Sequence, residues 1–259
     1  MDIPAKSLTV YPDLRGQHVF ITGGATGIGA ALVRSFSAQG ARVAFIDFDE
    51  ENALTICDEI EKAGAPRPWF KKVDVTEVPK LQAAIREAVD ELGNIYALIN
   101  NVANDSRHSP EEFSEEDWRK TLAVNLDPVF FAAQAAFPGM KEEQRGSIIN
   151  FGSISALLGQ PDMPGYITAK AAIMGLTRSL ARAYGPSKVR VNTLMPGWVV
   201  TERQLDLWLT PEAEADWQKQ VALTDRLLPQ DVANLALFLA SSDSRMITAQ
   251  ELVIDAGRI

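Results

Sequence analysis

Three residues in the second half of the chain have the types and the spacing of an acid–base centre: Tyr166, Lys170 and Ser153. Tyr166 and Lys170 stand four residues apart at the start of an expected helix, which places both side chains on one helical face. A free phenol has a pKa of about 10 and is a poor base at neutral pH. A neighbouring ammonium and a helix N-terminus both favour the phenolate, so we expect the pKa of Tyr166 to be lowered. Ser153 ends an expected strand, where its hydroxyl can hold a substrate oxygen opposite the tyrosine.

A glycine-rich loop predicts a site for the phosphates of a dinucleotide. The run Thr22-Gly23-Gly24-Ala25-Thr26-Gly27-Ile28-Gly29 follows an expected strand and opens an expected helix. Glycines let backbone N–H groups approach a pyrophosphate, and the helix N-terminus adds its dipole. The spacing is G-x-x-x-G-x-G rather than G-x-G-x-x-G, so the loop alone also fits an ordinary turn. Its position between strand and helix favours the binding site, with Gly23, Thr26, Gly27, Ile28 and Gly29 as candidate contacts.

An acidic residue at the end of the second expected strand predicts the choice of cofactor. Asp47 lies 18 residues after Gly29, a distance at which a carboxylate can accept hydrogen bonds from the adenosine ribose. A carboxylate repels a 2′-phosphate, and the next residue, Phe48, a further candidate cofactor contact, carries no positive charge. We therefore expect NAD rather than NADP. The alternative is that Asp47 caps the helix expected from Glu50, although Asp49 is better placed for that role.

The elements that position these residues alternate between strand and helix. Helical patterns cover residues 28–39, 50–63, 80–92, 118–137, 166–184 and 230–240. Short apolar runs typical of parallel strands covered on both faces span residues 18–22, 42–46, 69–73, 95–100, 147–151, 190–194 and 251–254. This alternation predicts an α/β fold: one doubly wound domain over residues 1–259, with helices on both faces of a seven-stranded parallel sheet.

Two longer segments interrupt the alternation, at residues 104–116 and 197–220. Each follows an expected strand, and open α/β sheets bind ligands beyond the carboxyl ends of their strands. We expect both to form substrate walls rather than simple connectors, with Arg107 and His108 equally compatible with a solvated loop. The candidate substrate contacts are Asn104, Ser153, Ser155, Gln160, Tyr166 and Trp198.

Composition narrows the class of protein. The chain has 25 Lys and Arg against 34 Asp and Glu, a net charge of −9, and no basic cluster. Nucleic-acid binding is therefore not expected. The single cysteine, Cys57, lies in an apolar helical pattern and indicates a reducing compartment. No apolar leader or membrane span is found, so we expect a cytoplasmic protein. We also expect no metal site.

Over essentially its whole length the sequence resembles the short-chain dehydrogenase/reductase family, which has a Rossmann-type fold. Ser153, Tyr166 and Lys170 match the family's catalytic residues. The resemblance implies that Asn125 is a fourth, holding a water that connects Lys170 to solvent. It also implies that Lys170 binds the nicotinamide ribose, and that related enzymes are commonly homotetramers. Further cofactor contacts implied by the resemblance are Asp74, Val75, Asn101, Val102, Ala103, Tyr166, Pro196, Gly197, Val199 and Thr201.

The family motif N-N-A-G reads Asn100-Asn101-Val102-Ala103 here. Alanine in the last position can shift the local backbone. Because both asparagines remain, we expect cofactor binding to persist.

Within the family, the segments 101–108, 151–155, 201–204 and 254–257 resemble bacterial sugar 1-dehydrogenases of the D-xylose type. That resemblance implies NAD-dependent oxidation of an aldose at C1 to the lactone. The polar donors and the flat face of Trp198 also suit a polyhydroxylated small molecule better than a steroid or an acyl chain. The alternatives are oxidation of a secondary alcohol in a sugar acid, an acyl-carrier ketoreductase, and a nucleotide-sensing protein without catalysis.

Overall fold

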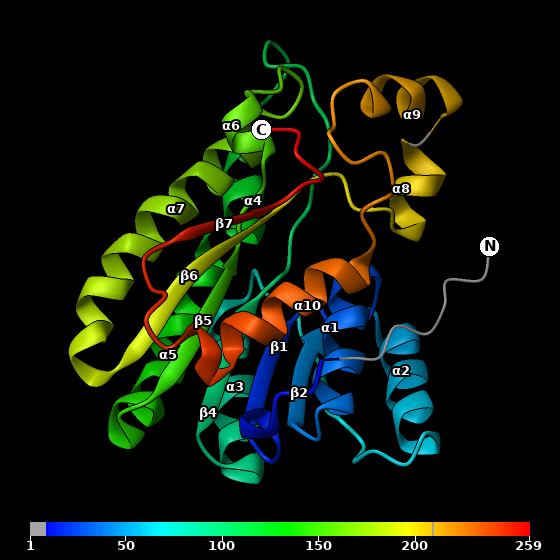
Figure 1. Ribbon diagram of the computed structural model, residues 1–259. Coiled ribbons are helices and arrows are strands. Elements are labelled where there is room, and N and C mark those ends of the chain that lie inside the picture. The colour runs from blue at the N-terminus through cyan, green and yellow to red at the C-terminus, as the bar shows by residue number, and fades with distance from the viewer. Residues whose placement is uncertain (1–8, 209) are drawn as a thin grey trace.

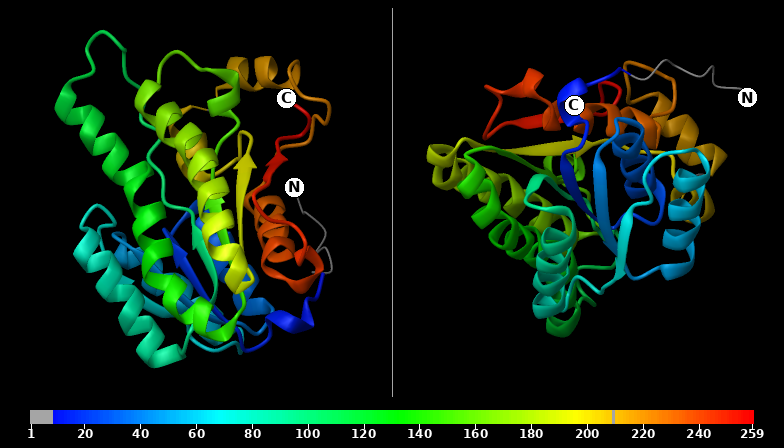
Figure 2. Two further views of the ribbon diagram at one scale, coloured as in Figure 1. Left: turned by 90° about the vertical axis from the view of Figure 1, so that its left-hand side faces the viewer. Right: turned by 90° about the horizontal axis from the view of Figure 1, so that it is seen from below.

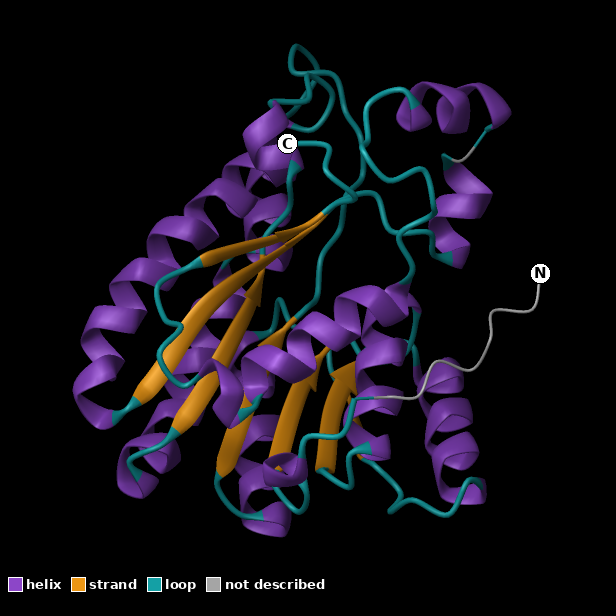
Figure 3. Ribbon diagram, viewed as in Figure 1, coloured by secondary structure: helices purple, strands orange, loops and turns teal. Residues whose placement is uncertain are grey.

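The computed structural model describes the backbone of residues 9–208 and 210–259. Its seven strands form one parallel sheet in the order β3-β2-β1-β4-β5-β6-β7. The strands are β1 (His18–Thr22), β2 (Arg42–Asp47), β3 (Trp69–Lys72), β4 (Ile95–Asn100), β5 (Gly146–Phe151), β6 (Val189–Pro196) and β7 (Glu251–Ile254). The seven-stranded parallel sheet predicted from the sequence is confirmed, and each expected strand is present with small shifts at its ends (Figures 1 and 3).

Helices cover both faces of this sheet, as predicted. One apolar core joins the sheet to α1 (Gly27–Ala38), α2 (Glu50–Lys62) and α10 (Pro229–Ala240). The other joins it to α3 (Val78–Leu92), α5 (Asp127–Glu143) and α7 (Pro164–Tyr184). The view from below in Figure 2 shows these two layers on opposite sides of the strands. Successive side chains of a strand point alternately into the two cores. Both faces of the strand are therefore apolar, and its sequence is a continuous apolar run.

The direction of winding reverses between β1 and β4. The chain runs outward from β1 to β3, then crosses back so that β4 pairs with the other side of β1. Ligands of such sheets bind beyond the carboxyl ends of the strands at this reversal. The glycine loop after β1 and the segments after β4, β5 and β6 all lie at this edge, at the top of the sheet in Figure 1.

The prediction of one helix over residues 118–137 is wrong. Two helices occupy this stretch, α4 (Glu115–Asn125) and α5, separated at Leu126, whose backbone leaves the helical range at φ −123° and ψ −54°. Pro128 stands in the first turn of α5. It has no N–H to donate to the carbonyl of Val124, and in a continuous helix its ring would clash with that carbonyl. The break makes Asn125 the last residue of α4.

The segment after β6 contains two helices that the periodicity did not predict, α8 (Glu202–Leu207) and α9 (Pro211–Gln218). Each begins with a threonine cap: the side chain of Thr201 accepts from Gln204 N–H and that of Thr210 from Ala213 N–H. Both helices are too short for an apolar period to stand out. A further short helix, α6 (Ser155–Leu158), follows β5.

A line of polar side chains runs through the buried middle of the molecule from β4 to β6. Asn100 Nδ2 donates to Asn150 Oδ1 at 2.9 Å, and Asn150 Nδ2 donates to Thr177 Oγ1 at 2.9 Å. The Thr193 hydroxyl also donates to Thr177 Oγ1 at 2.9 Å. All four residues are buried, so these bonds offset the cost of removing the groups from water.

None of the helices in the described part of the chain combines the length and the apolar composition that crossing a bilayer requires.

Candidate active site

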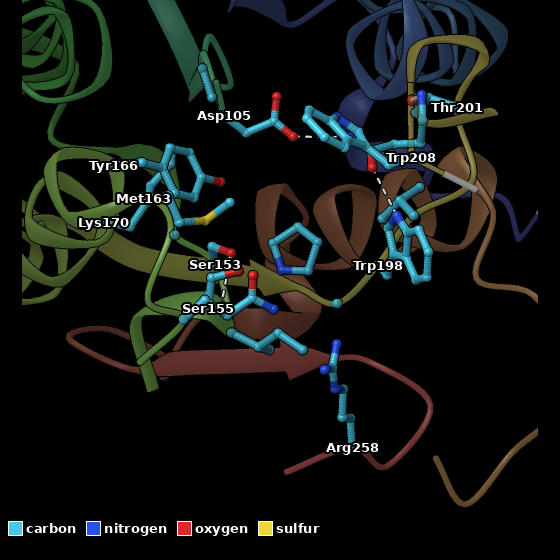
Figure 4. Close-up of a pocket in the computed structure, with 18 of the residues that line it drawn as sticks. Asp105, Ser153, Ser155, Met163, Tyr166, Lys170, Trp198, Thr201, Trp208 and Arg258 are labelled. Carbon is cyan, nitrogen blue, oxygen red and sulfur yellow. Dashed lines mark hydrogen bonds between the residues drawn. The ribbon is translucent and has the colours of Figure 1, made fainter. Parts of the chain in front are cut away.

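A cavity of about 370 Å³ opens at the carboxyl edge of the sheet, above the reversal between β1 and β4 (Figure 4). It brings together residues that follow strands β1, β4, β5, β6 and β7. Of the residues predicted from the sequence, the cavity wall includes Ile28, Asn101, Ala103, Ser153, Ser155, Gln160, Tyr166, Lys170, Pro196, Gly197, Trp198, Val199 and Thr201. Three of the four predicted catalytic residues and most of the predicted substrate contacts therefore line the same cavity.

Ser153 and Tyr166 face the cavity from the same side in Figure 4. Ser153 follows the end of β5, and its Oγ accepts a hydrogen bond from Ser155 N–H at 3.1 Å. This bond leaves the hydroxyl proton free to point into the cavity. Tyr166 lies in the first turn of α7, and only 9% of it is exposed.

Lys170 lies one turn further along α7 and is buried below the tyrosine. Its Nζ donates to Phe151 O at 2.7 Å and stands 5.6 Å from the centre of the Tyr166 ring. The backbone of β5 therefore fixes the ammonium group beside the phenol.

The expected lowering of the tyrosine pKa is wrong. Burial raises the pKa of Tyr166 to about 12, with the Ser153 hydroxyl acting in the opposite direction. Burial also lowers the pKa of Lys170 to about 7. Desolvation disfavours both charged forms, and it outweighs the hydrogen bond of Ser153 at Tyr166 and the charge of Asp105 at Lys170.

Asn125 is fully buried at the end of α4, next to the loop after β4. Its Oδ1 accepts from Asn104 N–H at 2.9 Å, and its Nδ2 donates to the carbonyls of Asn104 at 3.1 Å and Thr121 at 3.0 Å. The asparagine thus fixes the backbone where that loop leaves the sheet. It is not part of the cavity wall itself.

The glycine loop has the shape that a pyrophosphate requires. Gly23 has φ +72°, and a Cβ on Gly29 would lie 1.7 Å from Gly23 O, so neither position accepts a side chain without rearrangement. Thr26 precedes α1 without capping it through its side chain, which leaves first-turn N–H groups of the helix open to an anion. The residues present fit the phosphates of a dinucleotide.

Asn101 holds this loop to β4. Its Nδ2 donates to Gly23 O at 2.8 Å and Thr22 O at 3.2 Å, and its N–H donates to the Thr22 hydroxyl at 3.1 Å. Val102 N–H reaches the same hydroxyl at 3.3 Å. Ala103 is not among the residues with positive φ, so alanine in place of the family's glycine carries no backbone strain.

Asp47 ends β2 beside the glycine loop. Its Oδ2 accepts from Ala25 N–H at 2.9 Å and its Oδ1 from Asp49 N–H at 3.1 Å. Asp49, not Asp47, caps α2 by accepting from Asn52 N–H. Phe48 is 76% exposed next to the carboxylate, at the outer end of the predicted dinucleotide site.

The remaining cofactor predictions lie around this centre. Asp74 accepts from the N–H and hydroxyl of Thr76, while Val75 is buried in the core. Thr201 packs over the loop: a Cβ on Gly27 would lie 3.2 Å from its Cγ2. Val199 bridges to Leu227 and holds the start of the 197–220 segment.

Among the substrate predictions, Ser155, Gln160 and Trp198 line the cavity and Asn104 does not. Asn104 Oδ1 instead accepts from the N–H and hydroxyl of Ser106 within its own loop. It borders a second hollow on the other side of that loop, as does His108, whose ring stacks on Phe113 at 3.6 Å. Arg107 lines both spaces, with its guanidinium 4.1 Å from the centre of the Trp208 ring.

Several cavity residues were not predicted. They include Asp105, Met163, Gln204, Trp208, Asp216, Trp217, Gln220 and Arg258. Most belong to the two segments expected to form substrate walls, so position after a strand could have indicated them as a group. Arg258 gives no such signal, because it reaches the cavity only once β7 has paired with β6.

Comparison with known proteins settles the family. A family model described as enoyl-(acyl carrier protein) reductase matches residues 23–258. The chain is 47% identical over 257 residues to a probable galactose dehydrogenase of Rhizobium meliloti, covering 99% of each chain. The chain belongs to the short-chain dehydrogenase/reductase family. It is therefore an oxidoreductase with a nicotinamide cofactor.

Two further relatives are informative. A D-xylose 1-dehydrogenase of Caulobacter vibrioides is 44% identical over 252 residues, covering 97% of this chain and 99% of the relative. A crystal structure of a 3-oxoacyl-(acyl-carrier protein) reductase with bound NAD from Brucella melitensis is 30% identical, with a TM-score of 0.89 and coverage of 100% of this chain and 97% of that one. These likenesses confirm the predicted fold class and family.

Proposed function

We propose that this enzyme oxidises an aldose at C1 to the lactone with NAD as the hydride acceptor. The observation that carries the proposal is the cavity itself, where Ser153, Tyr166 and Lys170 face a wall of amide, carboxylate and indole groups. A sugar presents hydroxyls to such polar groups and C–H faces to tryptophan rings. The relatives named galactose dehydrogenase and D-xylose 1-dehydrogenase support the same class of substrate.

The chain's own residues carry the proton. Ser153 donates a hydrogen bond to the C1 oxygen and stabilises the negative charge that develops there. Tyr166, in its phenolate form, takes the hydroxyl proton as general base, which typically contributes about 10²–10⁴-fold. Lys170, in its ammonium form, favours the phenolate. Its pKa near 7 lets it release a proton at neutral pH.

The NAD-binding residues are proposed as follows. The glycine loop and the start of α1 would hold the pyrophosphate, and Lys170 the nicotinamide ribose. The Asp47 carboxylate would face the adenosine ribose, where its negative charge disfavours a 2′-phosphate. NAD supplies a hydride acceptor when bound at this edge.

One observation favours a second candidate, oxidation of a secondary alcohol in a sugar acid. Arg258 lines the cavity, its Nη2 donates to Gln220 at 2.8 Å, and its buried Nε has no hydrogen-bond partner. A guanidinium with a free donor can pair with a substrate carboxylate.

An activity screen separates the two candidates. Wild-type enzyme is assayed by NADH or NADPH absorbance against pentoses, hexoses, 6-deoxyhexoses and 2-keto-3-deoxy sugar acids. We expect turnover of aldoses with NAD, slower turnover with NADP, and loss of most turnover in Tyr166→Phe while NADH still binds. Turnover of the sugar acids alone would select the second candidate, and a wild-type rate in Tyr166→Phe would remove the proposed base.

We further propose that the enzyme is a cytoplasmic homo-oligomer, a tetramer by family analogy. The free, buried Cys57 suits a reducing compartment. Exposed apolar side chains on α6 and the edge strand β7, including Leu157, Leu158 and Val253, offer surface for another copy. Light scattering coupled to size exclusion tests the state directly.

A further inference from the structure

Asp105 stands at the point where the two substrate walls meet. It belongs to the loop after β4, and its Oδ2 accepts from Gln204 Nε2 at 2.9 Å. Gln204 lies in α8, after β6, and its Oε1 accepts from the indole Nε1 of Trp198 at 2.8 Å. All three residues line the cavity, so a chain of hydrogen bonds crosses it from one wall to the other (Figure 4).

The carboxylate of Asp105 keeps unused hydrogen-bonding capacity. A carboxylate offers about four acceptor positions. Gln204 occupies one, and the exposed Arg203 reaches Oδ1 at 3.3 Å. The side chain remains 29% exposed, so the other positions are open to a ligand.

The charge of Asp105 also affects the pKa values of the reacting groups. Burial is the main cause of the shifted pKa values of Tyr166 and Lys170, and the Asp105 charge raises both pKa values. The other cavity carboxylate, Asp216, pairs with Lys219 at 2.8 Å and is not among the groups that shift these residues. Because Asp105 lines the same cavity as Ser153 and Tyr166, a ligand held at C1 by these two residues would place another part of its ring within reach of Asp105.

We propose that Asp105 is a specificity-determining residue whose carboxylate accepts a hydrogen bond from a ring hydroxyl of the aldose, remote from C1. Gln204 acts as a positioning residue that aims this carboxylate and ties it to Trp198. The inference rests on the proposed function, since it assigns one hydroxyl of the same substrate. A hydrogen bond to a charged group is worth roughly 10- to 100-fold in kcat/KM.

The test pairs Asp105→Asn with monodeoxy derivatives of the best wild-type aldose, each lacking one ring hydroxyl. We expect one derivative to react about 10- to 100-fold more slowly than the parent sugar with wild-type enzyme. Asp105→Asn should slow the parent by a similar factor, mainly through KM, and should leave that derivative nearly unchanged. The two losses would then be coupled, as contact between the two groups requires.

Two further variants separate recognition from a purely structural role. Asp162→Asn is the matched control, because Asp162 pairs with Arg107 at 3.4 Å in the same region but does not line the cavity. It should behave as wild type. Gln204→Leu breaks the link to Trp198 but keeps the carboxylate, so it should slow every sugar while retaining discrimination between parent and derivative. NADH binding, followed by tryptophan fluorescence, verifies the fold of each variant.

The outcomes are distinct. If wild type oxidises aldoses but Asp105→Asn slows the parent and all derivatives equally, or none of them, the assignment of Asp105 is wrong and the proposed function stands. The assignment is equally overturned if Gln204→Leu abolishes discrimination, because the link alone then explains it. If wild type oxidises no aldose, both the proposed function and this inference fail.

Discussion

At the scale of single residues, the acid–base centre is governed by burial rather than by attraction between its charges. Tyr166 and Lys170 are both nearly excluded from water, and each is pushed towards its neutral form. A lysine with a pKa near 7 gives up a proton far more readily than one with the ordinary value of about 10.4. The pair can therefore pass a proton at neutral pH, even though the phenol alone is a weak acid.

This burial has a measurable cost in stability. Between about pH 10 and 7, Lys170 is largely charged in the unfolded chain but largely neutral in the folded one, so lowering the pH favours unfolding. The cost is fully present below the folded pKa of about 7. We predict that Lys170→Met gains stability relative to wild type as pH falls from 10 to 7, by on the order of 4 kcal/mol.

Denaturant unfolding at several pH values measures this difference. Loss of the bond to Phe151 O adds an offset that does not depend on pH. Lys62→Met, which removes an exposed lysine at the end of α2, is the control and should leave the difference flat. A flat difference for Lys170→Met as well would mean that the lysine remains charged in the folded protein.

At the scale of elements, the site depends on turns whose backbone excludes side chains. The glycine loop, α1 and Asn101 form one unit in which Gly29 has no room for a Cβ. A methyl group there would meet a backbone oxygen, so the loop must shift and carry the open N–H groups with it.

We predict that Gly29→Ala weakens NADH binding by more than 10-fold, on the order of the loss of one or two charged hydrogen bonds, and lowers the Tm. Gly175→Ala is a matched control on the exposed face of α7, where a Cβ meets nothing within 4 Å. It should leave binding unchanged and keep or raise stability by up to about 1 kcal/mol. Equal behaviour of the two variants in a fluorescence titration and a thermal melt would contradict the predicted role of the loop.

Elements also differ in how well they can be predicted from the sequence. The strands were predictable because each is a short apolar run between turn signals, and Ser153, Tyr166 and Lys170 were predictable because their spacing is local. The break at Leu126 was missed because the helical apolar period continues across it, whereas Pro128 ends the first helix. Asp105 and Gln204 were not predictable as partners, since their contact joins segments after different strands. The pKa of Tyr166 required the depth of burial, which spacing does not contain.

At the scale of the whole molecule, the buried His18 makes the stability of the folded protein depend on pH in the acid range. It lies 1% exposed at the start of β1, with Nδ1 2.6 Å from Gly93 O, and burial lowers its pKa to about 4. Below pH 6.5 the unfolded chain binds a proton that the folded chain does not, so stability falls as the pH falls towards 4. Net charge predicts the opposite trend, because the charge of −9 at pH 7 declines towards the isoelectric point near 4.9.

We predict that His18→Asn reduces the loss of stability between pH 6.5 and 4 by up to about 3 kcal/mol. Urea unfolding across this range is the measurement. His108→Asn removes the other of the two histidines and is the control, which should follow wild type. An unchanged acid profile for His18→Asn would assign the effect to carboxylates instead.

The buried polar line from Asn100 through Asn150 and Thr177 to Thr193 constrains how this sequence can change over time. An apolar replacement at one of the four positions leaves a neighbour's donor or acceptor unpaired in a site that water does not reach. Such a replacement is tolerated only if a second follows or is already in place. Substitutions at the four positions should therefore be correlated among related sequences, whereas residues of the substrate walls can be replaced one at a time.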